Sequence, residues 1–246
     1  MAEGGIMKVI AVRIDSMIRL SDWLPFLSPE RRERVGRFYR EMDSIRCVLS
    51  ELVAKSLIIE MTGCSSDQIA IQGDQFGKPY MSGPYHHIQF NISHSGTWVV
   101  GIANDQGHPV GIDIEQIDED MELGSFASIL SIDEKRVLDS VPVNERMEHF
   151  IELWTYKESY VKADGKGLSM PIDLCSFTPS LTGEAAWQLA SPSDIPYYWK
   201  SYSVHPDYKM TACSAYKRLP ETCAVSKASE FLQRYVDLRA HAASAT

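Results

Sequence analysis

The stretch VGIDIE, Val110 to Glu115, divides the chain into two halves. Its apolar and polar side chains alternate, which predicts a β-strand with one buried face. A turn-rich segment, DQGHP, lies directly before it and ends an apolar run, WVVGIAN. We therefore place a boundary near Pro109 and predict an N-terminal subdomain at 1–109, a C-terminal subdomain at 110–216 and an extension at 217–246.

The half before this boundary begins with a strand and two helices. Residues 7–15 are apolar and β-branched enough to form a strand. Ser28-Pro29-Glu30 starts a helix, because serine caps a helix and proline suits its first position. Apolar residues three and four apart predict a second helix over 43–61, which Gly63 ends. Three elements follow: short strands at 69–71 and 77–80, and a hairpin whose tight turn we place at Ser93–Gly96.

The second half repeats this order about 100 residues later. Ser131-Ile132-Asp133-Glu134 starts a helix, and a long amphipathic helix over 144–163 parallels the one over 43–61. The predicted fold class is therefore α+β (α/β), with two similar subdomains related by a pseudo-twofold axis. Each subdomain is expected to hold a small antiparallel sheet packed against a long helix. The remaining predictions are hairpin strands at 198–204 and 209–216, a helix over 229–238 and a disordered end at 240–246.

The composition of the chain excludes several classes of protein. It has 246 residues, 44% hydrophobic, and a formal net charge of −9. Disordered and low-complexity classes are excluded, and the acidic excess argues against nucleic-acid partners, which require Lys and Arg. Fourteen acidic and four basic residues lie between Asp105 and Glu158, whereas six arginines lie between Arg31 and Arg46. Two solvated helix faces explain this pattern, and so does a site that holds a polyanionic ligand beside a metal.

The cysteines and the N-terminus predict the compartment. Five cysteines are scattered along the chain without a CxxC pair, which favours free thiols in a reducing environment. The first residues show no signal-peptide pattern, and no apolar run approaches the roughly 18 residues of a membrane span. We therefore predict a soluble, cytoplasmic protein that does not bind a membrane.

Asp113 and Glu115 are the first candidates for chemistry. Positions i and i+2 of a strand face the same side, so the two carboxylates converge on one spot. Their mutual repulsion among apolar neighbours favours a bound Mg²⁺. An edge strand with two solvated acids gives the same pattern.

Glu158 and Lys162 are the second candidates. Bulky neighbours such as Trp154 and Tyr160 indicate that both side chains are half-buried. A metal ligand beside a phosphate partner fits this arrangement, and an ordinary surface ion pair one helical turn apart fits it equally well.

Three shorter segments place polar side chains on predicted turns. Lys78 and Lys166 lie in glycine-containing turns, where the backbone can come close to a ligand. Ser93 and His94 put a hydroxyl and an imidazole on the hairpin turn. Each of these side chains suits a phosphate, and each is also common on a solvent-exposed turn.

Three motifs together resemble the Sfp-type 4′-phosphopantetheinyl transferases, which activate non-ribosomal peptide and polyketide synthetases. They are FNISHSG, VGIDIE and LWTYKESYVKADGKGL, in this order and spacing, within a likeness that covers nearly the whole chain. The resemblance implies transfer of the phosphopantetheine arm of coenzyme A to a serine of an apo peptidyl or acyl carrier domain, with release of 3′,5′-ADP. It also implies a monomer with the cofactor cleft between its two subdomains.

The resemblance implies a role for each candidate residue. Asp113, Glu115 and Glu158 match the family's Mg²⁺ ligands, with Mn²⁺ as an alternative ion. Glu158 would also take the serine proton, directly or through a water, and Lys162 would be a second catalytic residue that contacts the phosphates. The other implied cofactor-binding residues are Lys78 near the adenine nucleotide, Ser93 and His94 at the phosphates, and Arg31 and Arg34 at the 3′-phosphate, where relatives commonly carry lysines.

Two positions depart from the family pattern. Cys47 and Ile117 stand where a relative has threonines that touch the cofactor, so these two contacts are not carried over.

Two other functions are compatible with these residues. A Mg²⁺-dependent hydrolase of nucleotide diphosphates would use the same carboxylates, but it would pass the phosphoryl group to water. A degenerate transferase would keep carrier binding without catalysis. The intact set of Asp113, Glu115, Glu158 and Lys162 argues against this second alternative.

Overall fold

The described part of the chain divides into two units. The structure is a computed structural model that describes residues 5–167, 170–173, 175–180, 186–190 and 195–244. Unit 1 consists of Met1–Gln72, Pro79–Gly107 and Thr222–Thr246, and unit 2 consists of Gly73–Lys78 and His108–Glu221.

A four-stranded sheet with the order β11-β1-β5-β4 forms the base of unit 1. β1 (Met7–Arg13) pairs antiparallel with β5 (Trp98–Asn104) and parallel with β11 (Ala224–Lys227). β4 (Gln89–Ser95) forms an antiparallel hairpin with β5. Every residue of β5 is buried, which matches its continuous apolar sequence.

The long helix α3 (Glu41–Thr62) packs against β5. Glycine permits the close approach, because a Cβ on Gly101 would lie 2.7 Å from Val53 and 3.0 Å from Leu57. The helix ends at Gly63, whose φ of 68° is the left-handed conformation that glycine adopts readily. The short helix α2 (Pro29–Val35) packs on α3.

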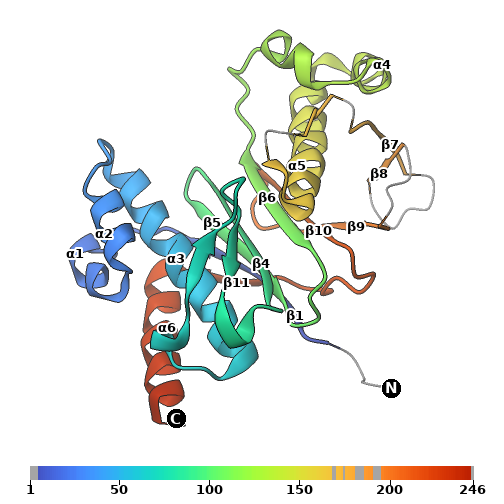
Figure 1. Cartoon of the computed structure of the whole chain (residues 1–246). Helices are drawn as coiled ribbons and strands as arrows, with labels where there is room; N and C mark the ends of the chain where they lie inside the picture. Colours follow the sequence, from blue (N-terminus) through green and yellow to red (C-terminus); the bar gives the residue numbers. More distant parts are fainter. Residues whose placement is uncertain (1–4, 168–169, 174, 181–185, 191–194, 245–246) are drawn as a thin grey trace. The chain divides into compact units, whose positions relative to one another are not determined.

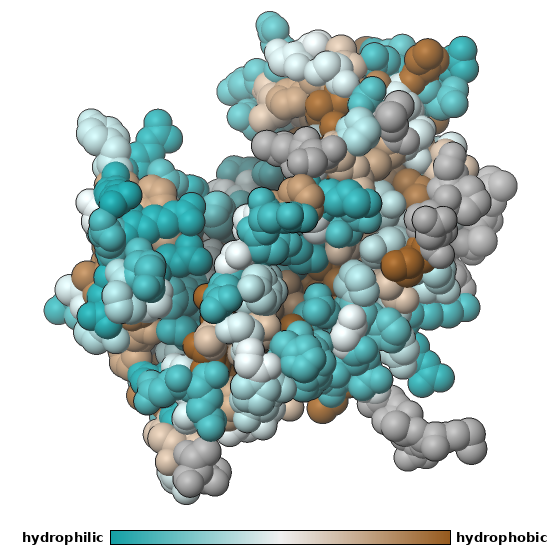
Figure 2. Space-filling view, in the orientation of Figure 1, coloured by the Kyte–Doolittle hydropathy of each residue, from teal (hydrophilic) through white to brown (hydrophobic). Residues whose placement is uncertain are grey.

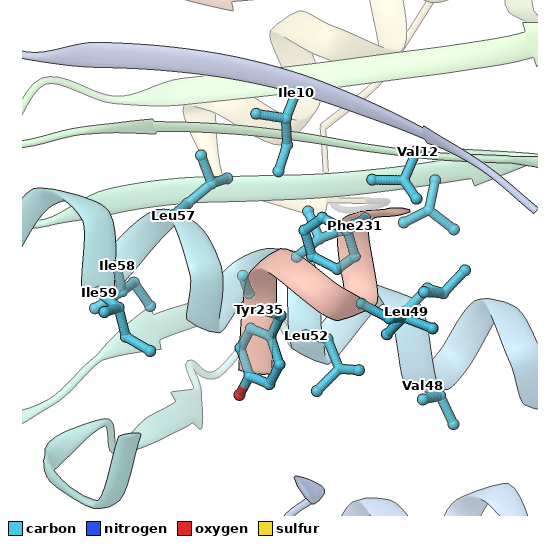
Figure 3. Close-up of a cluster of buried hydrophobic side chains, with 14 of the residues drawn as sticks. Ile10, Val12, Val48, Leu49, Leu52, Leu57, Ile58, Ile59, Phe231 and Tyr235 are labelled. Carbon is cyan, nitrogen blue, oxygen red and sulfur yellow. The ribbon is translucent and has the colours of Figure 1, made fainter. Parts of the chain in front are cut away.

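The core of unit 1 lies between the sheet and two helices (Figure 3). Ile10 and Val12 of β1 point toward Leu52 of α3 and toward the aromatic rings of Phe231 and Tyr235. These two aromatic residues belong to α6 (Ala228–Ser244), which lies alongside α3 (Figure 1). Burial of such large apolar side chains is the main stabilising contribution to this unit.

The C-terminal segment is an integral part of unit 1. β11 extends the sheet beside β1, and α6 supplies part of the core. Asp15, which follows β1, accepts hydrogen bonds from the Ser229 backbone N at 3.2 Å and Oγ at 2.8 Å, and so satisfies the first turn of α6. The helix continues to Ser244, so the prediction of disorder from Ala240 onward is wrong for the residues up to Ser244.

Unit 2 contains a three-stranded antiparallel sheet with the order β6-β10-β9. These strands are β6 (Val110–Gln116), β10 (Tyr208–Ser214) and β9 (Tyr198–Ser201). The long helix α5 (Arg146–Asp164) crosses β6 and β10 (Figure 1). The two units share a pairing pattern. In unit 1, β1 pairs with β5, which pairs with β4, and in unit 2, β6 pairs with β10, which pairs with β9.

Shorter elements connect these parts. The helix predicted to start at Ser131–Glu134 is α4 (Ile132–Ser140), in which Ser131 and Glu134 form a capping box. The others are α1 (Leu20–Trp23), β2 (Ile71–Gly73), β3 (Pro79–Met81), β7 (Phe177–Pro179), β8 (Trp187–Leu189) and the 3₁₀ helices at Leu24–Phe26, Ser66–Gln68, Gly83–Tyr85, Leu123–Ile129 and Val143–Glu145.

The α+β class and the antiparallel sheets with long helices are confirmed. The position predicted for the hairpin turn, Ser93–Gly96, is wrong. β4 continues through Ser95, and only Gly96 and Thr97 lie between β4 and β5. Ser93 and His94 therefore lie on a strand. Because consecutive strand residues point to opposite faces, Ser93 is buried while His94 is exposed.

Two observations concern the surface. Hydrophilic side chains cover most of the surface seen in Figure 2, and hydrophobic residues appear there as separate small groups. Within the part of the chain that the structure describes, no helix is both long and apolar enough to cross a lipid bilayer.

We expect Phe231→Ala to destabilise the protein by about 3–5 kcal/mol, because it removes a buried ring and leaves a cavity. Val236→Ala on the exposed side of the same helix should cost no more than about 0.5 kcal/mol. Urea denaturation of both variants measures the difference. Equal stabilities would show that α6 does not contribute to the core of unit 1.

Candidate active site

A glycine brings α5 into contact with the backbone of β6. A Cβ on Gly111 would lie 2.0 Å from the carbonyl oxygen of Ser159 and 2.5 Å from the backbone nitrogen of Ala163. No other residue fits this space without moving the helix. The close approach places the next residue on the same face of the strand, Asp113, against the polar side of α5.

Asp113 and Lys162 form an ion pair across this contact. Lys162 Nζ lies 2.5 Å from Asp113 Oδ1, and the side chains are 26% and 2% exposed. On the neighbouring strand, Thr211 stands opposite Asp113 and shares a hydrogen bond of 2.8 Å with Thr155 of α5. The hydroxyl pair and the ion pair thus connect α5 to two residues that lie opposite each other in the sheet, Thr211 and Asp113.

Glu158 lies one helical turn before Lys162 and is half-buried. Burial raises the pKa of its carboxyl group above 4.5, the negative charge of Asp113 raises it further, and the ammonium group of Lys162 lowers it. The carboxylates of Asp113 and Glu158, from different elements, therefore act on one another, and the charge of Lys162 acts on both.

Glu115 continues the same face of β6 by two residues and is half-buried. Its partner across the sheet is Lys209 of β10, whose Nζ lies 2.6 Å from Glu148 Oε1 on α5. Residues directly opposite in a sheet are close neighbours on one face. A row of charged side chains thus runs along the face of β6 that α5 covers.

A buried ion pair anchors the other side of α5. Lys157, next to Glu158 in the sequence, binds both oxygens of Glu134 at 2.8 and 2.9 Å and the carbonyl oxygen of Cys175 at 2.7 Å. Both charged side chains are fully buried. Loss of either partner would leave an uncompensated charge, so this pair holds the rotation of α5.

Lys78 lies at the C-terminus of α5. Its Nζ donates to the carbonyl oxygen of Ala163 at 3.0 Å, where the partial negative charge of the helix terminus favours a cation. Burial lowers the pKa of Lys78. Gly165, with φ of 85°, ends the helix, and a Cβ at this position would lie 3.2 Å from Lys78 Cδ. The predicted role of Lys78 in cofactor binding stays a prediction.

The other predicted cofactor-binding residues belong to unit 1. Arg31 contacts α3 through Glu51 and Cys47, while Arg34 is exposed on α2. Ser93 and His94 lie near the end of β4, next to a turn that Arg46 of α3 holds by two hydrogen bonds to the Gly96 carbonyl, at 2.7 and 2.9 Å. Arg31 and this hairpin therefore both contact the first half of α3.

Three carboxylates of unit 2 are the residues of this site that could hold a metal. Asp113, Glu115 and Glu158 offer only carboxylate oxygens, which are the ligands of Mg²⁺, and their combined charge exceeds that of Lys162. The donor set thus fits a divalent cation. As the side chains stand, no three His, Cys, Asp or Glu residues of the described segments converge closely enough to hold a metal.

Comparisons with known proteins identify the family. A family model described as the 4′-phosphopantetheinyl transferase superfamily matches residues 109–213, and one described as the 4′-phosphopantetheinyl transferase N-terminal region matches 16–106. The 4′-phosphopantetheinyl transferase Sfp of Bacillus subtilis (strain 168) is 34% identical over 92% of this chain and 100% of its own length. The 4′-phosphopantetheinyl transferase psf-1 of Bacillus pumilus is 33% identical over 93% of this chain and 98% of its own.

These matches show that the chain belongs to the 4′-phosphopantetheinyl transferase superfamily and, within it, to the Sfp-type enzymes, which confirms the resemblance found in the motifs. A solved holo-(acyl-carrier-protein) synthase from Bacillus anthracis matches 43% of this chain and 93% of its own, with 18% identity and a TM-score of 0.38. That likeness is too weak to support a conclusion.

Sequence patterns did not single out two supporting groups. The Thr155–Thr211 hydroxyl pair and the Lys157–Glu134 ion pair join residues 56 and 23 positions apart, so only the tertiary structure brings them together. Gly111 did carry a signal, because a glycine inside a strand pattern often marks a close backbone approach.

We expect Gly111→Ala to destabilise the protein by about 3 kcal/mol, because its Cβ would overlap the backbone of α5. Gly124→Ala, which has open space around its Cβ, should change stability by no more than about 0.5 kcal/mol. Chemical denaturation followed by far-UV circular dichroism tests both. A tolerated alanine at position 111 would contradict the close contact.

The raised pKa of Glu158 predicts a pH-dependent effect of Glu158→Gln. The folded protein holds the Glu158 proton at higher pH than the unfolded chain, so this residue costs stability as the pH rises through its folded pKa. Glutamine carries no charge. We therefore expect the variant to be more stable than the wild type at pH 7, with the difference vanishing near about pH 4.

Urea denaturation at a series of pH values measures this difference, with Glu145→Gln at an exposed position before α5 as the control. A variant less stable than the wild type at pH 7 would show that the Glu158 charge is favourably solvated in the folded state.

Proposed function

We propose that this protein transfers the 4′-phosphopantetheine arm of coenzyme A to a serine of apo carrier domains and releases 3′,5′-ADP. The observation that carries the proposal is the contact of Asp113 with Lys162, beside a Glu158 whose pKa burial raises. The Sfp-type relatives support the same reaction. The acceptors are carrier domains of non-ribosomal peptide, polyketide and fatty-acid synthases.

Asp113, Glu115 and Glu158 would hold a Mg²⁺ ion, or Mn²⁺ in its place. A bound divalent ion would neutralise charge on the pyrophosphate of coenzyme A. The three carboxylates project from facing elements, two from β6 and one from α5, and they offer oxygen ligands only.

The chain's own residues move one proton and orient one phosphorus atom. The carrier serine oxygen forms a bond to the phosphorus that bears the pantetheine arm, and the bond from that phosphorus to the 3′,5′-ADP oxygen breaks. Glu158 accepts the serine proton, since a carboxylate with a raised pKa is a stronger base. Lys162 contacts the phosphates and stabilises the charge that develops on the departing group.

The remaining cofactor contacts fall to basic and polar residues of both units. We propose that Arg31 and Arg34 bind the 3′-phosphate, that Lys78 lies near the adenine nucleotide, and that Ser93 and His94 bind the phosphates. An arginine suits a phosphate through paired N–H donors.

We further propose that the enzyme works as a cytoplasmic monomer. All five cysteines are free thiols, which suits a reducing compartment. Its partners would be coenzyme A and the carrier domain, with no nucleic acid or membrane.

The experiment that tests the function is intact-mass measurement of an apo carrier domain after incubation with this protein, coenzyme A and Mg²⁺. We expect the carrier to gain the mass of the phosphopantetheine arm. Asp113→Asn and Glu158→Gln should slow this transfer by at least about 100-fold, because they remove a metal ligand and the base. Removal of divalent ions with a chelator should stop it.

Asp133→Asn, in an exposed ion pair with Arg136, serves as the matched control and should retain full activity. Cleavage of coenzyme A without a gain of carrier mass would favour the hydrolase alternative. An unmodified carrier that still binds the protein would favour a non-catalytic adaptor.

A further inference from the structure

A buried carboxylate contacts Arg31, one of the two arginines that we propose bind the 3′-phosphate. Glu51, in the middle of α3, is only 6% exposed. Its Oε2 lies 3.3 Å from Arg31 Nε, and its Oε1 accepts hydrogen bonds from the backbone N of Ser28 at 2.9 Å and pairs with Lys55 Nζ at 2.6 Å. One carboxylate therefore binds both the first residue before α2 and a side chain of that helix.

A second group of α3 touches the same guanidinium. Cys47 lies one helical turn before Glu51, and its Sγ is 3.7 Å from Arg31 Nη1. The guanidinium group is planar, so contacts at Nε and at Nη1 fix both its position and the plane in which its other donors lie.

The charges of this group are arranged so that Arg31 keeps its attraction for an anion. Glu51 is shared between Arg31 and Lys55, and Lys55 also donates to the carbonyl oxygen of Phe26 at 2.9 Å. Two cations with one carboxylate leave a net positive charge. A single isolated Arg–Glu pair would leave none.

We propose that Glu51 is a positioning residue for 3′-phosphate recognition: it holds the Arg31 guanidinium in a fixed orientation and so sets the preference for coenzyme A over dephospho-coenzyme A. This inference rests on the proposed function. Cys47 assists through its contact with Nη1, which gives this position a use that differs from a hydroxyl contact with the cofactor.

The proposal explains why arginine suits this position. An arginine binds the carboxylate through Nε and keeps further donors on the same plane for a phosphate. A lysine has one ammonium group, a point charge on a flexible stem, and it cannot serve both partners with a fixed geometry. Arg31→Lys should therefore lose much of the preference although the charge is kept.

The test compares adenosine 3′,5′-bisphosphate with adenosine 5′-monophosphate by isothermal titration calorimetry, and coenzyme A with dephospho-coenzyme A in the transfer assay. We expect Glu51→Gln to reduce the preference for the 3′-phosphorylated ligand about tenfold, mainly through Kd and KM, with kcat little changed. Glu33→Gln, which breaks an exposed ion pair between Glu33 of α2 and Arg37 beyond its end, is the matched control and should leave the preference unchanged.

In Arg31→Lys, Glu51 keeps its contacts with Ser28 and Lys55 and loses only the guanidinium group as a partner. This variant therefore serves as the background for a double substitution. In that background we expect Glu51→Gln to have no further effect on the preference, because the two changes act on one interaction. Additive effects would overturn the proposal. Equal weakening of both ligands by Glu51→Gln would also overturn it, since that result indicates general destabilisation of unit 1.

The outcomes separate this inference from the function on which it rests. If the wild type transfers the arm and prefers the 3′-phosphorylated ligand while Glu51→Gln keeps that preference, the positioning role fails and the function stands. If the wild type neither transfers the arm nor prefers the 3′-phosphate, the proposed function itself fails.

Discussion

The contact between Gly111 and the backbone of α5 is the constraint on which the site in unit 2 depends. The strand and the helix approach so closely that a single methyl group would separate them. Because the side chains of a strand alternate, the residue two positions further on must then meet the helix at the level of Lys162. The position of Asp113 therefore follows from the absence of a side chain at its neighbour on the same face.

Two ion pairs hold α5 in this contact with β6. Lys157 and Glu134 are fully buried and bind each other on one side of α5, while Asp113 and Lys162 pair on another. Buried charges tolerate little displacement, because each loses its partner when the helix turns or slides. Glu158 lies between these two pairs along the helix and is held with a carboxyl group whose pKa is raised by burial and by Asp113. The close contact of α5 with β6 thus accounts both for the packing of the site and for the raised pKa of Glu158.

The sequence predicted the α+β class, the two long helices, the shared strand face of Asp113 and Glu115 and the helical spacing of Glu158 and Lys162, because strand alternation and helix spacing are local properties. The approach of Asp113 to Lys162 across two elements was implied only by the resemblance to the family. It placed Ser93 and His94 on a turn, since serine and glycine favour turns, but pairing with β5 extends the strand through Ser95. Partners that are far apart in the chain, such as Glu51 and Arg31 or Asp15 and Ser229, depend on tertiary packing and leave no local pattern.

Unit 1 draws on both the beginning and the end of the described chain, whereas unit 2 is formed almost entirely by one continuous stretch. During synthesis, the whole of His108–Glu221 leaves the ribosome before β11 and α6 do. The sheet and core of unit 1 are complete only when β11 and α6 have been made, although β1 precedes unit 2 in the chain. Of these two units, the one whose first strand comes earlier in the chain is therefore the one whose fold is completed later.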